Sequence, residues 1–340
     1  MAHFDYTFGV EIECFLPEDS VNKAALADAI SRRLGQRNAC QVQVYAHTVP
    51  TNWKIITDGS LGNYERGIEV VSPILRNQEG LDQVAIVCRA LSDFGCTVNK
   101  KCGLHVHVGV GNASLKFWKD IVSLYSIFEP VLDKMMPPSR RASQNTYCRT
   151  MTTARMQDIQ SASTFRTLSS VATPGSRYHK VNMQAYLRYR TIEFRQHSGT
   201  TDATKACNWI LICLKMVHLA KHETFNYASF NGNAPRNTAR PGTKNHLVVE
   251  MLLRPQGVTS HEALQATGWT SISIPETVRP YGINFTSQKT GRITRYFAVR
   301  STTAQVTIDS FATLINLNDD ERTYMHNRTN DLAGQVAWAA

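Results

Sequence analysis

Chemically active side chains recur at a spacing of two residues in this 340-residue sequence. In a β-strand, side chains two residues apart point to the same face of the sheet. Carboxylates crowded on one face repel one another unless cations neutralise them, and hard divalent ions with oxygen ligands do so. If one sheet carries all of these strands, its polar face is a candidate site for magnesium and the substrate phosphates that bind with it. The positions are Glu11 and Glu13, Glu69, His105 and His107, and Glu193 and Arg195.

Each of these positions has a simpler explanation when it is taken alone. Alternating glutamates on a strand are typical of the solvated face of an antiparallel sheet. A single His-x-His pair more often has a structural or surface role than a metal-binding one. The occurrence of all the pairs in one chain therefore carries the prediction of a nucleoside-triphosphate site.

The stretch from Lys134 to Arg195 holds most of the excess positive charge. It contains eleven Lys and Arg residues and two acids, in a chain with 37 Lys+Arg, 27 Asp+Glu and a net charge of +10. One interpretation is a nucleic-acid-binding surface. The other is a set of arginines that binds a polyphosphate and stabilises the charge developed in phosphoryl transfer. Charge alone does not decide between them.

Several classes of protein are disfavoured by motifs that the sequence lacks. It has no Walker A motif, no Gly-x-Gly-x-x-Gly and no Gly-x-Ser-x-Gly. The eight cysteines include no Cys-x-x-Cys pair, which disfavours a zinc ribbon and predicts reduced, mostly buried thiols. The N-terminus lacks a signal-peptide pattern, and the longest apolar run, Trp209–Leu214, is too short to span a bilayer. We therefore expect a soluble cytoplasmic protein with no membrane partner.

Periodicity divides the chain into four parts. Residues 1–225 alternate strand-like and helix-like segments and are expected to form one domain. Residues 226–244 are rich in Asn, Gly, Pro and Arg, which is typical of a linker. Residues 245–300 predict three helices followed by a hairpin, the outline of a small winged-helix-like domain. Residues 301–340 are expected to form a C-terminal tail.

Six segments within the first 222 residues resemble, in order, the motifs of the amidoligase family, which belongs to the glutamine-synthetase-like carboxylate–amine ligases. The resemblance implies an α+β fold, with a curved antiparallel sheet and helices packed on one face. It also implies ATP-dependent ligation of a carboxylate to an amine through an acyl phosphate, with ATP and Mg²⁺ over the open face of the sheet. The segments are Phe8-Gly-Val-Glu-Ile-Glu13, Thr57-Asp-Gly-Ser-Leu61, Gly67-Ile-Glu-Val-Val-Ser-Pro73, Cys102-Gly-Leu-His-Val-His-Val-Gly109, Arg177-Tyr-His-Lys-Val-Asn182 and Thr191-Ile-Glu-Phe-Arg-Gln-His-Ser-Gly-Thr200.

The resemblance also implies roles for individual residues of the polar face. Acids on three or more strands, together with one histidine, would hold the metal ions. Histidines, basic residues and an asparagine around them would contact nucleotide phosphate or the substrate carboxylate. The metal-binding residues would be Glu11, Glu13, Glu69, His107 and Glu193, and the cofactor-binding residues His105, His107, Arg177, Lys180, Asn182 and Arg195.

Three residues would take part in the reaction itself. Arg195 would stabilise the negative charge that develops during phosphoryl transfer. The amine must lose a proton before it attacks, because an ammonium ion has no lone pair. Asp58, in the Asp-Gly-Ser-Leu segment, or Glu69 would act as the base.

The small unit at 245–300 resembles winged-helix domains of bacterial and phage proteins. Its second helix is expected to begin at a capping box, Thr259-Ser-His-Glu262. DNA contact through phosphates and recruitment of a protein partner are both open. The basic residues expected on the wing are Lys289, Arg292, Arg295 and Arg300.

The leading hypothesis is therefore an ATP- and Mg²⁺-dependent carboxylate–amine ligase that acts on a peptide or a macromolecule. A peptide, a protein side chain, a polyamine and a modified macromolecule are all open as substrates. One alternative is a nucleic-acid-binding protein that keeps the ligase fold without turnover. Another is an amide hydrolase that uses the same metal site, as some relatives of the Pup ligases do. Related ligases often assemble, so a homo-oligomer is also among the expectations.

Overall fold

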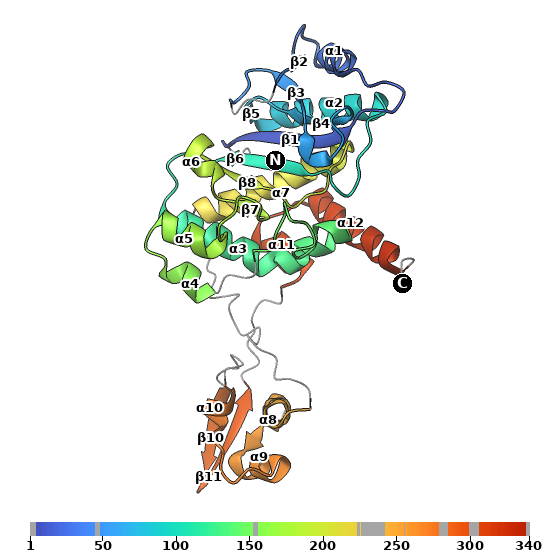
Figure 1. Cartoon of the computed structure of the whole chain (residues 1–340). Coiled ribbons are helices and arrows are strands. Elements are labelled where there is room, and N and C mark those ends of the chain that lie inside the picture. Colours follow the sequence, from blue (N-terminus) through green and yellow to red (C-terminus); the bar gives the residue numbers. More distant parts are fainter. Residues whose placement is uncertain are drawn as a thin grey trace. The chain divides into compact units, whose positions relative to one another are not determined.

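The chain folds into two compact units in the computed structural model (Figure 1). The larger unit comprises Met1–Phe225 and Val306–Ala340, and the smaller comprises Asn226–Gln305. The smaller unit is therefore inserted between two parts of the larger one and does not simply follow it. The linker expected at 226–244 lies almost wholly outside the described residues. The structure describes residues 5–44, 48–151, 156–222, 225, 242–254, 256–278, 285–298 and 306–337.

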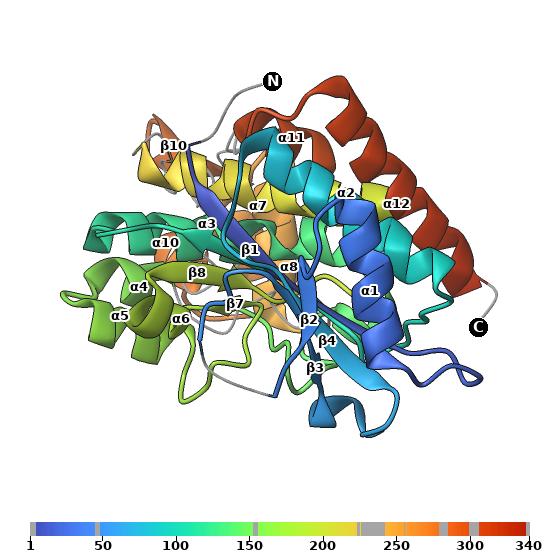
Figure 2. The ribbon, with the colours of Figure 1, turned by 90° about the horizontal axis from the view of Figure 1, so that it is seen from above.

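Eight strands of the described residues form the central sheet of the larger unit (Figure 2). Seven follow the order β2-β3-β4-β1-β6-β8-β7, and β5 pairs with β1. The α+β class is confirmed, but β2 and β3 are parallel, so the sheet is mixed where a fully antiparallel one was expected. The strands are β1 (Thr7–Phe15), β2 (Cys40–Val42), β3 (Trp53–Thr57), β4 (Gly67–Val71), β5 (Leu75–Arg76), β6 (Leu104–Gly109), β7 (Val181–Asn182) and β8 (Thr191–Phe194).

The sequence of β1 explains how the sheet acquires two different faces. Phe8, Val10 and Ile12 point to one face and are buried, and Glu11 and Glu13 alternate with them and point to the other. Burial of each large apolar side chain contributes about 1.5–3 kcal/mol to folding. The apolar face is therefore held against the helices, and the acidic face stays open.

Four helices form the layer that packs on this apolar face. Helix α1 contacts β2 and β3, α2 contacts β5, and α7 contacts both β6 and α3. Helix α3 continues without interruption through Pro130. No helix within the described residues is long and apolar enough to cross a membrane. The helices are α1 (Lys23–Leu34), α2 (Asn77–Asp93), α3 (Leu115–Lys134) and α7 (Ala203–Lys221).

The stretch 137–176, which shows little periodicity, contains short helices in its described part. They span three to eight residues, too few for a period of 3.6 to stand out in the sequence. Similar short helices occur after β3 and before β8. These elements are η1 (Gly59–Leu61), η2 (Pro138–Arg140), α4 (Met156–Ser161), α5 (Phe165–Ala172) and α6 (Ala185–Tyr189).

The expected C-terminal tail is an integral part of the larger unit. It forms α11 (Ile308–Leu314) and α12 (Asp319–Ala337), both of which contact α3. The ring of Phe311 lies 4.9 Å from that of Phe128 in α3. Lys215 of α7 donates a hydrogen bond from Nζ to Glu321 Oε2 at 2.5 Å. A buried aromatic pair and a buried ion pair thus fix a segment whose polar composition resembled a tail.

The inserted unit contains the helices and the hairpin that the sequence predicts. The capping box is confirmed: Thr259 Oγ1 accepts from the Glu262 amide, and Glu262 Oε2 accepts from the Thr259 amide. Arg295 of the expected wing makes two hydrogen bonds to Glu262, at 2.7 and 3.0 Å. Arg300 lies outside the described residues. The elements are α8 (Lys244–Leu253), β9 (Val258–Thr259), α9 (Ser260–Thr267), α10 (Ile274–Val278), β10 (Phe285–Thr290) and β11 (Ile293–Ala298).

Candidate functional site

Strand register brings the predicted polar residues to one face of the sheet. Residues that are directly opposite in neighbouring antiparallel strands point to the same face and interact. Strands β4, β1, β6, β8 and β7 are consecutive neighbours, so a row of polar side chains crosses them. The register pairs are Glu69 with Glu13, Glu11 with His105, His107 with Glu193, and Glu193 with Asn182.

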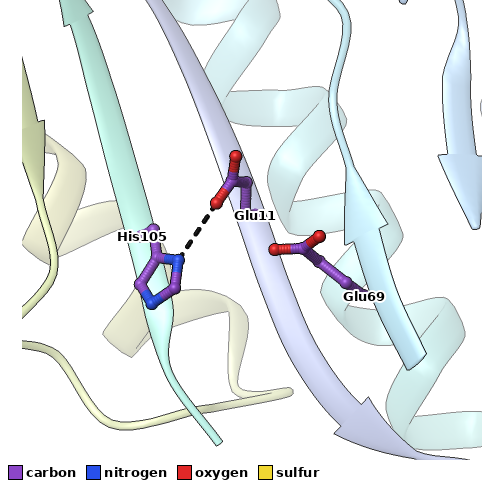
Figure 3. A group of neighbouring side chains, drawn as sticks. All are labelled: Glu11, Glu69 and His105. Carbon is purple, nitrogen blue, oxygen red and sulfur yellow. Dashed lines mark hydrogen bonds and ion pairs between the residues drawn. The ribbon is translucent and has the colours of Figure 1, made fainter. Parts of the chain in front are cut away.

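Glu11 lies at the centre of the first cluster of possible metal ligands. Figure 3 shows it on β1 between His105 of β6 and Glu69 of β4. Ligand atoms of these three residues lie within 4.8 Å of one another. His105 Nδ1 is 3.0 Å from Glu11 Oε2, and its Nε2 is 3.5 Å from Glu13 Oε1. His105 therefore links the two glutamates of β1.

A second cluster shares Glu11 with the first. It consists of Glu11, His107 and Glu193, whose ligand atoms also lie within 4.8 Å of one another. His107 Nδ1 is 3.1 Å from the Thr191 hydroxyl, which fixes the orientation of the ring. His107 Nε2 is buried 3.4 Å from Glu11 Oε1, yet it makes no aligned hydrogen bond within the described residues. This nitrogen therefore faces the carboxylates of Glu11 and Glu193 at ion-pair distance without an aligned hydrogen bond to either.

Two carboxyl groups of the site are stabilised as anions. Burial alone would raise the pKa of Glu11, but His105 and His107 outweigh it and hold that pKa well below its ordinary value. Burial would also raise the pKa of Glu193, and the charges of Arg195 and His107 lower it instead. Both residues therefore carry their negative charge at neutral pH.

Two other carboxyl groups experience the opposite effect. Burial raises the pKa of Glu69 well above its ordinary value, and the negative charges of Glu11, Glu13 and Asp58 raise it further. The pKa of Glu13 is also raised, first by burial and then by Asp58, although His105 opposes the shift. This end of the site holds more negative charge than its own residues balance, and a cation would relieve the repulsion.

Arg195 and Asn182 hold Glu193 in place. Arg195 donates from Nη1 to Glu193 Oε1, and Asn182 Nδ2 donates to Glu193 Oε2 at 2.5 Å. Burial would lower the pKa of Arg195, but the charge of Glu193 raises it, so the guanidinium stays protonated. A fixed positive charge thus lies beside the second cluster.

A second buried arginine, Arg140, lies next to the first cluster. It is 2% exposed, and its Nη2 donates to the Lys101 carbonyl at 3.1 Å. A Cβ on Gly103 would lie 2.8 Å from His105 Nε2 and 3.0 Å from Arg140 Nη2, closer than side chains tolerate. Glycine at this position is therefore what allows the imidazole and the guanidinium to approach each other.

These groups open into one cavity of about 1130 Å³. Its wall includes the open face of the sheet, helix α6 and the segment that follows α3. All of the predicted site residues except Lys180 line it. They are Glu11, Glu13, Asp58, Glu69, His105, His107, Arg177, Asn182, Glu193 and Arg195.

Comparison with known families assigns the part of the chain that builds this cavity. Residues 5–217 match the protein family described as "Putative amidoligase enzyme". The chain belongs to this family. The matched region of the amidoligase includes every residue of the cavity wall.

Comparisons with individual proteins add little to the amidoligase assignment. No curated protein matches the chain. Among solved structures, the cryo-EM structure of Plasmodium falciparum glutamine synthetase is similar, with 13% identity and a TM-score of 0.35. That alignment covers 98% of this chain and 73% of the other. Similarity at this level supports no argument about the fold or the function.

In the amidoligase structure, Lys180 does not have the environment expected of a nucleotide-binding residue. Its side chain is fully buried, and it does not line the cavity. Its Nζ donates to Glu129 Oε1 at 2.6 Å and to Asp133 Oδ1 at 2.5 Å, both on α3. The prediction that Lys180 binds the cofactor is therefore corrected, because strand alternation alone could not show that the chain turns this side chain toward α3.

Several residues of the cavity wall were not predicted as site residues, among them a buried arginine and two tyrosines. Arg140 comes from the aperiodic stretch after α3, where the sequence gives no orientation. Tyr147 and Tyr178 lie in the same wall, with ring centroids 5.1 Å apart. The abundance of arginine in 134–195 was the available signal for Arg140, and it could not separate one arginine from ten other basic residues.

Proposed function

We propose that this protein ligates a carboxylate to an amine in an ATP- and Mg²⁺-dependent reaction that passes through an acyl phosphate. The observation that carries the proposal is the convergence of Glu11, Glu69, Glu193 and two imidazoles on the open face of the sheet. In a member of the amidoligase family, excess buried carboxylates beside arginines support the binding of a divalent cation with a polyphosphate.

The donor set fits a hard divalent cation. Magnesium prefers carboxylate oxygens, retains several waters and is commonly bound together with substrate phosphates. Glu11 belongs to both clusters and would therefore be a ligand at two cation positions, one shared with Glu69 and the other shared with Glu193. The Nε2 of His107, which makes no aligned hydrogen bond within the described residues, adds a nitrogen ligand, and this would also permit a transition-metal ion. When bound, the cation would neutralise negative charge on the phosphates.

The arginines of the wall would stabilise the first chemical step. The substrate carboxylate attacks the terminal phosphorus of ATP, the bond to the ADP oxygen breaks, and an acyl phosphate forms. Arg195 and Arg140 are buried and positively charged beside the two clusters, so they would stabilise charge on the transferring group without reorganising. Arg177 lies in the same wall.

The acidic end of the cavity would serve the second step. The amine attacks the acyl carbon and phosphate leaves, but the amine must first release a proton. Glu69, which lines this end of the cavity, is one candidate base. Asp58, which also lines the cavity, is the other candidate base.

We also propose that the reaction takes place in the cytoplasm and that the inserted unit recruits a substrate or a partner. All eight cysteines lie in the described part of the chain, and they are unpaired and mostly buried, which suits a reducing compartment. Arg295 bonds Glu262, so on this hairpin Lys289 and Arg292 would be the residues that contact DNA phosphate. DNA and protein partners, and self-association, are distinguishable by gel shift and by mass in solution.

The decisive experiment measures phosphate release with ATP, Mg²⁺ and pools of amino acids, peptides and polyamines. We expect release that requires an added carboxylate and is lost in Glu11→Gln and in Arg195→Ala. Omitting ATP tests the hydrolase alternative, since amide cleavage would then continue. Unchanged turnover in Glu11→Gln would overturn the assignment of the metal site.

A further inference from the structure

The mouth of the cavity is positively charged, in contrast to its acidic centre. Lys100, Lys101, Arg141 and Arg188 all line the cavity, and three of the four are exposed while Arg141 is partly buried. Among the described residues, no carboxylate forms an ion pair with any of the four. We call these four residues the cationic rim.

The cationic rim has two ends, separated along strand β6. Lys100 and Lys101 lie in the turn before the strand, separated from it by Cys102 and Gly103, and Arg188 lies in α6, just before β8. The end of β6 is beside β8 because Gly109 pairs with Thr191. The five residue steps of β6 at about 3.3 Å each separate the two backbone segments that carry the rim by ~17 Å. A single triphosphate bound at the central carboxylates would not reach both ends.

The proposed reaction requires the cavity to hold a nucleotide and a substrate together. Its volume of about 1130 Å³ lies above the roughly 300–1,000 Å³ that is usual for a site that binds one small molecule, which fits ATP with a segment of substrate. An extended peptide of about five residues would span the ~17 Å between the two ends of the rim. Carboxylates along such a peptide would meet cations at both ends.

We infer that the carboxylate substrate is an acidic peptide segment, rich in Asp and Glu, that binds along the cationic rim and presents one carboxyl group to the central site. This inference rests on the proposed ligase function. To that function it adds the class of the carboxylate substrate, which is a peptide whose side chains next to the reacting carboxylate are also anionic. The rim would contribute to binding and to the rate of association, both of which weaken as salt is added.

A nucleic acid fits the same charge less well. Single strands bind through base stacking on exposed aromatic rings. The Tyr189 ring is in edge contact with His107 and lies under the Arg188 guanidinium. Tyr178 lies between Tyr147 and the guanidinium of Arg195. The rings of Tyr178 and Tyr189 are partly covered by protein side chains, although Tyr147 is 47% exposed, and a nucleic acid supplies no carboxylate to activate.

The test measures binding of a fluorescent ten-residue Glu/Gly peptide to the full chain by anisotropy, without ATP. The comparison ligands are the matching Gln/Gly peptide and a single-stranded oligonucleotide of equal charge. The variants are Lys100→Glu/Lys101→Glu and Arg188→Glu, with Arg188→Gln as a milder change. Arg37→Glu and Arg89→Glu, which are exposed and outside the cavity, are matched controls.

We expect the acidic peptide to bind more tightly than the Gln peptide, and its affinity to fall about tenfold in each rim variant and by less than twofold in the controls. Arg188→Gln should lose less than Arg188→Glu. Equal binding of the two peptides, or rim variants that behave like the controls, would overturn the inference. Tighter binding of the oligonucleotide would overturn it in favour of nucleic acid. Melting temperatures establish that each variant is folded.

The outcome is separable from that of the proposed function. Because binding is measured without ATP, it does not depend on turnover. If ATP is consumed with a small carboxylate but the acidic peptide does not bind, only this inference fails. If the acidic peptide binds through the rim and no carboxylate supports ATP turnover, the ligase proposal fails, and the rim is a binding site for an acidic peptide that is not a ligase substrate.

Discussion

Two groups of buried charges in the larger unit differ in how completely they are balanced. At the end of α3, Lys180 lies between Glu129 and Asp133, and all four oxygens of these carboxylates accept hydrogen bonds. On the open sheet face, Glu69 is raised in pKa by burial and by the carboxylates around it. The first group is complete without a ligand, and the second is not.

The comparison teaches how a structural ion cluster can be told from a binding site. A buried charge is tolerated when it is paired and its remaining hydrogen-bonding positions are satisfied. Lys180 and its partners meet that condition and connect α3 to the segment that forms the cavity wall, through the amides of Ala142 and Met151. In the open-face cluster, His107 Nε2 makes no aligned hydrogen bond within the described residues and the pKa of Glu69 is raised by the acids around it, as expected where a ligand completes the set.

The largest effect is expected from Glu11→Gln, which removes the acid that both metal clusters share. Turnover of ATP should fall about 10³-fold, equivalent to ~4 kcal/mol, while the melting temperature changes little. Steady-state phosphate release measures the loss, and Glu65→Gln, an exposed acid outside the cavity, is the control. If Glu11→Gln kept its activity, the open-face cluster would not be a required metal site, and it would no longer differ in this way from the Lys180 group.

The next largest effect is expected from Lys180→Met, which breaks the balanced group. Removing one partner leaves two buried acids without their cation, so the free energy of unfolding should fall by ~3–5 kcal/mol. Urea denaturation measures it. Arg33→Met is the control, because Arg33 pairs with Asp93 at 2.5 Å while the two side chains are 45% and 59% exposed, so the pair should contribute only ~0.2–1 kcal/mol. Equal losses in the two variants would contradict the comparison.

A stabilising change is expected from Glu69→Gln in protein stripped of metal. The pKa of Glu69 is raised on folding, so its contribution to stability is present at low pH and is lost as the pH rises from the ordinary glutamate range through the raised pKa. At neutral pH the variant should therefore unfold at a higher temperature, by ~2–4 °C for each kcal/mol of repulsion removed.

The same variant tests the role of the cation. Added Mg²⁺ should raise the melting temperature of the wild-type protein by more than that of Glu69→Gln, since the ion relieves a repulsion that the variant lacks. Glu11 and Glu193 have lowered pKa values, so their contribution is lost only below the ordinary glutamate range and does not obscure the neutral window. A Glu69→Gln protein that is less stable than wild type at neutral pH would show that the acids are already balanced.

The smallest effect is expected in the inserted unit, from Arg295→Ala. Arg295 bonds Glu262 at 2.7 and 3.0 Å, but both side chains are more than a third exposed. The pair should contribute ~0.2–1 kcal/mol and weaken in high salt. Denaturation at two salt concentrations measures this contribution. A loss in the free energy of unfolding that exceeds 2 kcal/mol and does not depend on salt would show that this exposed pair stabilises the fold as a buried pair does, against the comparison.

Local patterns in the sequence determined most of the polar face of the sheet. Strand alternation places Glu11 and Glu13 on one face and Phe8, Val10 and Ile12 on the other, because side chains of an extended chain alternate whatever surrounds them. The capping box of α9 is equally local, since its two hydrogen bonds join residues three apart.

Only the tertiary structure decided which buried charges are paired, and that the C-terminal residues pack against the larger unit. Lys180 meets Glu129 and Asp133 across 51 and 47 residues, and Lys215 meets Glu321 across 106. Because of these contacts, Lys180 is a structural residue and does not bind the cofactor as predicted. The residues predicted to form a tail contain α11 and α12, which belong to the larger unit, so the smaller unit is an insertion. No local pattern encodes these contacts, because the free energy of burying a charge depends on which partners the rest of the chain supplies.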